Sequence, residues 1–81
     1  MAKAEVTVTQ NWQQIATGVV TVTILEKSKE GGAVLLNEIA SDVAAYRDYP
    51  EPGKQFVQNQ ALATFIRAQH NGWRVIVDGD L

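Results

Sequence analysis

The sequence predicts a small, mostly β domain, either an antiparallel β-sandwich or a partly open barrel of six to seven short strands. Two observations support this prediction. Segments rich in valine, threonine and isoleucine recur along the chain, and glycine, asparagine or proline residues separate them. The chain has 81 residues, which suits one domain, so we expect residues 1–81 to form a single sandwich.

The first half of the chain carries the clearest strand patterns. Glu5–Thr9 alternates apolar and polar residues, the period of a half-buried strand, with Val6 and Val8 facing inward. Val19–Leu25 is dominated by β-branched residues and is the strongest strand pattern. A polar turn that ends in two glycines follows, so Ala33–Glu38 is predicted to return as the second half of a hairpin.

Residues 39–49 have two interpretations. Ser41 could cap one short helix in this segment, or the segment could be a long surface loop. Tyr46 and Tyr49 flank Arg47 here, and tyrosine and arginine are enriched at contact surfaces. We therefore predict an interface at these three residues; the alternative is that both rings only pack the loop onto the sandwich.

The last third is ambiguous by periodicity alone. Ala61–Ala68 fits both a helical stripe and strand alternation. We favour the strand because Asn71 and Gly72 form a strong hairpin signal, and Trp73–Val77 after them has the composition of a strand. Asp78–Leu81 is predicted to be a polar tail.

Composition argues against an enzyme. The chain has no cysteine, and His70 is its only histidine, so a disulfide and a zinc site of the usual kind are both excluded. Ser28 and Ser41 do not lie in a Gly-x-Ser-x-Gly motif, and the glycine pair 31–32 leads into a strand pattern, not a helix. We predict no catalytic residue, no cofactor and no metal.

Charge and hydropathy limit the kinds of partner that we expect. The formal net charge is −2, and acidic and basic residues are interspersed, so nucleic acid is not an expected partner. No apolar run approaches the roughly 20 residues of a membrane span, so no membrane is expected either. A domain this small has a thin core, which favours self-association. The strand with Val6 and Val8 is the candidate open edge for pairing with another chain.

Several motifs in this order resemble a known family: Trp12-x-x-Ile15-Ala16-Thr17-Gly18, the strand Val19–Leu25, Pro52-Gly53, and Thr64–Ala68 ahead of a terminal strand. The order resembles small β-sandwich proteins of tailed bacteriophage virions, which are head-decoration or tail-associated modules. The resemblance covers roughly residues 5–77, although residues 39–49 are richer in alanine than that loop usually is.

The resemblance implies a non-enzymatic virion structural protein, made in the host cytoplasm and located in the virion. Its implied partners are other virion proteins and further copies of itself, with a trimer favoured. It also implies a strand at Ala61–Ala68. Two other functions stay open: a glycan-binding module at a tail tip, and a small regulatory domain that masks another protein. Exposed tryptophan or tyrosine would serve the glycan site, so burial of both Trp12 and Trp73 would argue against it.

Overall fold

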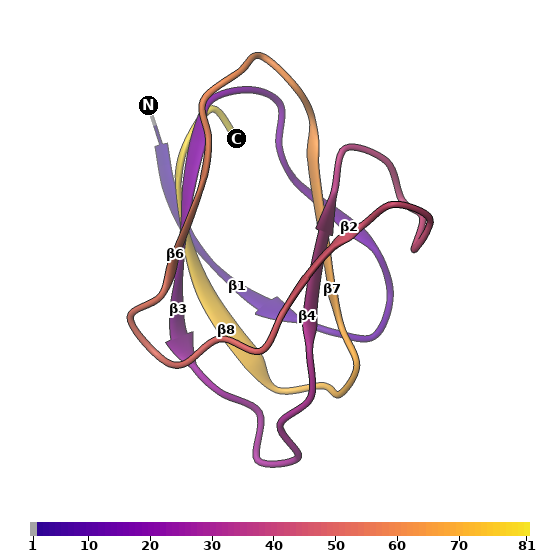
Figure 1. The fold of residues 1–81 in the computed structure, drawn as a ribbon. Coiled ribbons are helices and arrows are strands. Elements are labelled where there is room, and N and C mark those ends of the chain that lie inside the picture. Colours follow the sequence, from indigo (N-terminus) through magenta and orange to yellow (C-terminus); the bar gives the residue numbers. More distant parts are fainter. Residues whose placement is uncertain (1) are drawn as a thin grey trace.

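The computed structural model describes residues 2–81 and contains only strands, turns and loops in that part of the chain (Figure 1). The mostly β prediction is therefore confirmed. Eight strands are present, compared with the six to seven expected: β1 Ala2–Val8, β2 Gln13–Ala16, β3 Val20–Glu26, β4 Val34–Asn37, β5 Tyr46–Asp48, β6 Gln55–Gln58, β7 Thr64–Ala68 and β8 Trp73–Gly79.

The strands form two four-stranded antiparallel sheets, with orders β1-β8-β3-β6 and β2-β7-β4-β5. The first strand pairs with the last, the second with the seventh, the third with the sixth, and the fourth with the fifth. The chain therefore folds back on itself between β4 and β5, so that each strand of the first half pairs with one of the second half. Successive pairs lie alternately in the first and the second sheet. This eight-stranded arrangement is a jelly roll.

The core lies between the sheets and follows the period-2 alternation of the strands. In β3, β7 and β8, every second side chain is buried. Trp73 is the largest fully buried side chain. The main cluster consists of Val8, Ile15, Ala16, Val20, Val22, Ile24, Val34, Ile66, Ala68, Trp73, Val75 and Val77.

Both predicted hairpins are wrong, although their strands exist. β3 and β4 belong to different sheets, and so do β7 and β8. The Asn71–Gly72 turn leads the chain from one sheet to the other, and hydrogen bonds join it to the β1–β2 and β3–β4 connections. Asn71 Oδ1 accepts a hydrogen bond from Gln10 N at 2.9 Å, and Asn71 O accepts one from Ser28 Oγ at 2.8 Å. Turn residues mark where a chain reverses, but not which sheet receives the next strand.

Segment 39–49 contains no helix, so the possible short helix is wrong; the segment is a loop that ends in β5. Ser41 Oγ accepts a hydrogen bond from Val43 N at 3.1 Å, which closes a local turn. The Asn37 side chain donates to the backbone oxygens of Ser41 and Val43 at 2.8 and 3.0 Å. These bonds satisfy the backbone locally, and Ala44 takes a left-handed φ of 58°, which is incompatible with a continuing helix.

The two remaining predictions at the C-terminal end have opposite outcomes. Thr64–Ala68 is a strand, so the preference for a strand over a helix in this region is confirmed. Asp78–Leu81 is not a polar tail, because β8 continues to Gly79 and Asp80 bonds to the segment before β3. Asp80 N donates to Val19 O, and Asp80 O accepts from Thr17 N, both at 2.8 Å.

Candidate functional site

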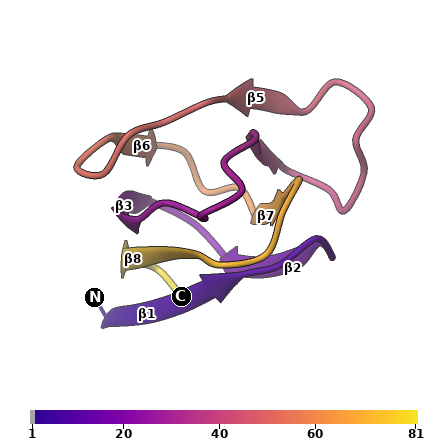
Figure 2. The same ribbon diagram turned by 90° about the horizontal axis from the view of Figure 1, so that it is seen from below.

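One side of the sandwich is open where the edge strands β5 and β6 of opposite sheets face each other (Figure 2). A groove of about 500 Å³ lies there, between β3 and β6 on one side and β4 and β5 on the other. Both edge strands are short, so neither can close the gap with a long hydrogen-bonded ladder.

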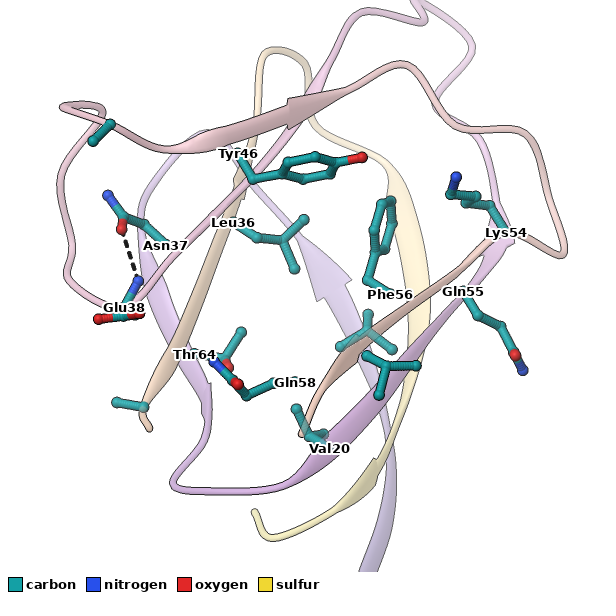
Figure 3. A pocket seen from close by; sticks show the side chains of 14 residues that line it. Val20, Leu36, Asn37, Glu38, Tyr46, Lys54, Gln55, Phe56, Gln58 and Thr64 are labelled. Atoms are coloured by element: carbon teal, nitrogen blue, oxygen red, sulfur yellow. Dashed lines mark hydrogen bonds between the residues drawn. The ribbon is translucent and has the colours of Figure 1, made fainter. Parts of the chain in front are cut away.

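Aromatic and charged side chains bridge one end of the groove (Figure 3). The rings of Tyr46 on β5 and Phe56 on β6 meet edge to face, with centroids 5.9 Å apart and planes at 70°. The Tyr46 hydroxyl donates to Asp48 Oδ2 at 3.0 Å. Lys54 Nζ lies 5.7 Å from the centre of the Phe56 ring and 3.7 Å from the same Asp48 oxygen. These four side chains tie the two sheets together at their open side.

The rest of the groove combines an apolar floor with a polar far end. Val20 and Val22 are 1% exposed, and the partly buried Leu36 packs against the same core. Gln58 and Thr64 lie at the end away from the aromatic pair (Figure 3). Thr64 is 6% exposed, and its hydroxyl has no hydrogen-bond partner. The groove therefore suits a mixed apolar and polar contact, not an ionic one.

Exposed apolar side chains surround this open side of the sandwich. They come from the β4–β5 loop, from β5 and the residue after it, and from β6. The exposed fractions are Ile39 59%, Val43 76%, Tyr46 55%, Tyr49 61% and Val57 66%. Isolated exposed apolar residues are normal, but five on the segments that border the open side make this side the candidate for contact with another protein. We call these five residues the open-side surface.

The residues of the predicted interface on β5 lie on opposite faces of the strand. Tyr46 and Asp48 share one face of β5 and are joined by the hydrogen bond along that strand, whereas Arg47 alternates to the other face. Arg47 pairs in register with Leu35, which pairs with Arg67, so Arg47 lies on the outer face of the second sheet with Arg67. Tyr46 is both half-exposed and packed on Phe56, so interface and packing roles coexist in one ring.

The other predicted interface residues, Val6 and Val8, lie at the opposite edge of the sandwich. Their strand β1 is an edge strand, separated from β6 by β8 and β3. Val8 is 0% exposed and belongs to the core, which agrees with its predicted inward orientation, so a contact at this strand would involve the Val8 backbone and not its side chain. Val6 is only partly buried. Both valines face inward, so Val8 is absent from the surface. What β1 exposes at the sheet edge is its backbone N–H and C=O groups.

A cluster on the outer face of the second sheet fixes the β4–β5 loop. Arg67 donates to both carboxylate oxygens of Asp42, from Nε to Oδ1 at 2.8 Å and from Nη2 to Oδ2 at 2.9 Å. Trp12 Nε1 also donates to Asp42 Oδ1 at 2.9 Å, and the Arg67 guanidinium lies 5.9 Å from the centre of the Trp12 ring. The hydrogen bond from Arg67 lowers the pKa of Asp42 below its ordinary value of 3.8; desolvation opposes this, and the Trp12 bond assists it.

Sequence reasoning missed most of this site. It gave no interface role to Phe56, Lys54, Val57 or Arg67. A partial signal existed in Gln55–Gln58, where apolar and polar residues mix in a short segment after a Pro-Gly break. No pattern indicated that this segment faces β5, because the two strands belong to different sheets and share no hydrogen bonds.

Comparisons with protein-family models, with curated proteins and with solved structures found no match to this chain. Residues 2–81 contain no helix that is long and apolar enough to cross a membrane. The same residues hold no group of three or more histidine, aspartate or glutamate side chains placed to bind a metal ion.

Proposed function

We propose that this protein is a non-enzymatic structural component of a tailed-bacteriophage virion, a capsid-decoration or tail-associated protein that acts through protein–protein contacts. One observation carries most of the proposal: the five apolar side chains of the open-side surface beside an aromatic-walled groove. Jelly rolls also build viral capsid domains, which agrees with the resemblance in the sequence motifs. That agreement is an analogy at the level of the fold, since one fold serves many functions.

A protein partner fits the open-side surface better than a glycan does. Trp73 is fully buried, and the half-buried Trp12 has the Arg67 guanidinium near its ring. Neither tryptophan therefore offers the open face on which a sugar ring stacks. Tyr46 and Tyr49 are both exposed and lie beside Asp48, and the Tyr46 ring already packs against Phe56. A glycan site at a tail tip is the second candidate, restricted to these two tyrosines.

In this proposal the protein is made in the host cytoplasm and resides in the virion. Its partners are other virion proteins, which the open-side surface contacts, and further copies of itself. The resemblance favours a trimer. A regulatory domain that masks another protein would use the same kind of surface, so the identity of the bound particle distinguishes the two functions.

Binding to virus particles tests the proposal. The protein is mixed with heads and with tails of the phage that encodes it, prepared without this protein, and co-sedimentation is measured. We expect saturable binding to one of the two. Val57→Lys places a charge in the open-side surface and should weaken binding at least tenfold, as the loss of an interface anchor does. Gln14→Lys adds the same charge on β2, an exposed site in the other sheet, and should leave binding unchanged.

Absence of binding to both heads and tails would overturn the virion assignment. Equal weakening by Val57→Lys and Gln14→Lys would overturn the open-side surface as the contact. The glycan alternative predicts a different pattern: Tyr46→Ala abolishes binding to immobilised host glycans, whereas Val57→Lys does not. Circular dichroism of each variant confirms that the sandwich remains folded.

A further inference from the structure

The four edge strands of the sandwich differ in how open they are to pairing with another chain. β5 has three residues, and β2 and β6 have four each. β2 is also irregular, because its register with β7 shifts between Gln14 and Ala16. β1 has seven residues, and all seven pair with β8 without a register shift. β1 is therefore the longest and most regular edge in the described chain.

β1 has only one of the devices that normally protect an edge strand, the exposed charges of Lys3 and Glu5. Proteins also blunt such edges with short strands, proline, bulges or charged side chains that point toward the core. β1 contains no proline and no bulge, and its inward-facing residues are Ala4, Val6 and Val8. Figure 2 shows β1 as the outermost strand of its sheet, opposite the groove side. Its free backbone groups are positioned to accept another strand.

We propose that β1 pairs with β1 of a second copy of this chain, antiparallel and centred on Ala4, so that two four-stranded sheets join into one of eight strands. The inference rests on the self-association in the proposed function, and it replaces the trimer that the resemblance favours with a two-fold dimer. Two-fold pairing of identical strands is the simplest closed arrangement for such an edge. It leaves the open-side surface free, because β1 and β6 are at opposite edges of the sheet.

The charged side chains of β1 determine the register of the proposed β1–β1 pair. When Ala4 faces Ala4 of the second copy, Lys3 lies opposite Glu5, and symmetry repeats this pair. Opposite charges at facing positions stabilise an antiparallel pair, and like charges destabilise it. A pair centred on Glu5 would overlap all seven residues, but it would place two Glu5 side chains against each other. We therefore expect the shorter overlap, residues 2–6, to be the one that forms.

The surroundings of the two charged residues agree with this register. Glu5 already accepts a hydrogen bond from Arg74 of the neighbouring strand, which holds its side chain on the outer face of the sheet. Lys3 faces Asp78 on β8, and no ion pair joins them in the structure. In the proposed dimer, Lys3 lies between Asp78 of its own chain and Glu5 of the second copy. On the inner face, the partly buried Val6 lies opposite Ala2, which is small enough to admit it.

Single-cysteine variants test the register directly, because the natural chain has no cysteine. Facing residues in an antiparallel pair have Cα atoms about 4.5–5.5 Å apart, which lies within disulfide range. Ala4→Cys should therefore form a covalent dimer under mild oxidation, at protein concentrations where light scattering reports a dimer. In Val6→Cys the two thiols are about 14 Å apart along the strands, so cross-linking should be at least tenfold slower.

A charge variant supplies an independent readout. Lys3→Glu replaces two attractive pairs with two repulsive ones, and the dimer dissociation constant should rise about tenfold or more. Lys29→Glu makes the same charge change at an exposed position between β3 and β4, and it should leave the dissociation constant unchanged. A wild-type protein that stays monomeric at millimolar concentration overturns the inference, and so does a trimer, since a two-fold pair cannot build a three-membered ring. Faster cross-linking of Glu5→Cys or Val6→Cys than of Ala4→Cys also overturns the register.

The outcomes for the dimer and for the virion proposal can be separated. If Lys3→Glu is monomeric and still sediments with phage particles in a Val57-dependent manner, both proposals hold and dimerisation is not required for binding. If Ala4→Cys cross-links but no particle binds the protein, the dimer holds and the virion assignment fails. If particles bind and no β1 variant cross-links or dissociates, the virion assignment holds and the dimer fails.

Discussion

Arg67 on β7 holds Asp42 of the β4–β5 loop through two hydrogen bonds of 2.8 and 2.9 Å, so one side chain of the sheet fixes a loop 25 residues away in sequence. The same face of the sheet carries Leu35, whose neighbour in register is Arg67. Leu35 is 1% exposed although its alternation turns it away from the main core. The anchor therefore stabilises a small second apolar contact outside the sandwich, and with it the loop that carries Ile39 and Val43.

The first prediction concerns the acid stability that this anchor confers. The Arg67 hydrogen bond lowers the pKa of Asp42 in the folded protein below 3.8, its value in an unfolded chain. A carboxylate with a depressed folded pKa stabilises the protein above its unfolded pKa, and this contribution is lost as pH falls through the folded pKa. We expect the urea midpoint of the wild type to fall below about pH 4, and Asp42→Asn to remove part of that dependence.

Glu38→Gln provides a matched control for Asp42→Asn, since Glu38 is exposed and only its backbone N–H, not its carboxylate, takes part in a hydrogen bond. Urea unfolding between pH 2 and pH 7 measures both variants. Asp42→Asn should be less stable than the wild type at pH 7 and equal to it near pH 2. An unchanged pH slope in Asp42→Asn would contradict the ionised Asp42–Arg67 pair as the source of the acid sensitivity.

Local sequence patterns predict where the strands of this protein lie, but they do not predict which strands pair. The alternation in β3 and β8 gives burial at every second residue, and the sequence shows this period directly. Pairing is different, because it depends on contacts between segments far apart in the chain. Val22 faces Val77 on one side and Phe56 on the other, and neither neighbour is adjacent in sequence. A strong turn dipeptide at Asn71–Gly72 could not reveal that the next strand enters the opposite sheet.

The candidate site was less accessible to sequence reasoning than the fold. Tyr46 and Tyr49 were predicted at an interface from residue type, and both are more than half exposed. The groove forms because β5 and β6, the edge strands of different sheets, lie opposite each other. No local sequence pattern predicts that two such strands will be neighbours. The role of Asp42 was equally hidden, since an aspartate in a loop has the same sequence signature whether it is solvated or bound by a distant arginine.

The second prediction concerns the close approach of two strands at Gly79. Its φ is 141°, and a Cβ there would come within 2.9 Å of Val20 Cα and even closer to the backbone oxygen of Val19. Gly79→Ala should therefore destabilise the protein by about 2–4 kcal/mol, combining backbone strain with displacement of β3. Urea denaturation measures this loss.

Gly53→Ala is the matched control for Gly79→Ala. Gly53 also has a positive φ, 95°, but a Cβ there would meet nothing within 4 Å. This variant bears the backbone strain alone, and we expect a loss of about 1 kcal/mol. Equal losses in the two variants would show that the contact of Gly79 with β3 contributes nothing.

The third prediction concerns the aromatic bridge across the groove. Edge-to-face pairs contribute about 0.5–1.5 kcal/mol beyond the area that they bury. A double-mutant cycle with Tyr46→Leu and Phe56→Leu should therefore give a coupling energy in that range. Tyr46→Phe should keep the coupling, because it removes only the hydroxyl that donates to Asp48. A coupling energy near zero would mean that the two rings touch without stabilising the open side.

The fourth prediction concerns Trp73, the largest fully buried side chain, which begins β8 and faces Val8 of β1 in register. Trp73→Ala leaves a large cavity in the core, and such truncations cost about 3–5 kcal/mol. Domains of this size have about 5–15 kcal/mol of total stability, so the variant should lose a large fraction of it and its urea midpoint should fall accordingly.

Trp73→Phe separates packing from hydrogen bonding at this site. It keeps most of the ring volume and loses the bond from Trp73 Nε1 to Gly31 O, which is long at 3.3 Å. We expect it to retain more than half of the stability that Trp73→Ala loses. Trp12→Phe, at a half-buried site, should cost less than Trp73→Phe because less buried surface is removed. Urea midpoints rank the three variants, and a smaller loss for Trp73→Ala than for Trp12→Phe would place the main core elsewhere.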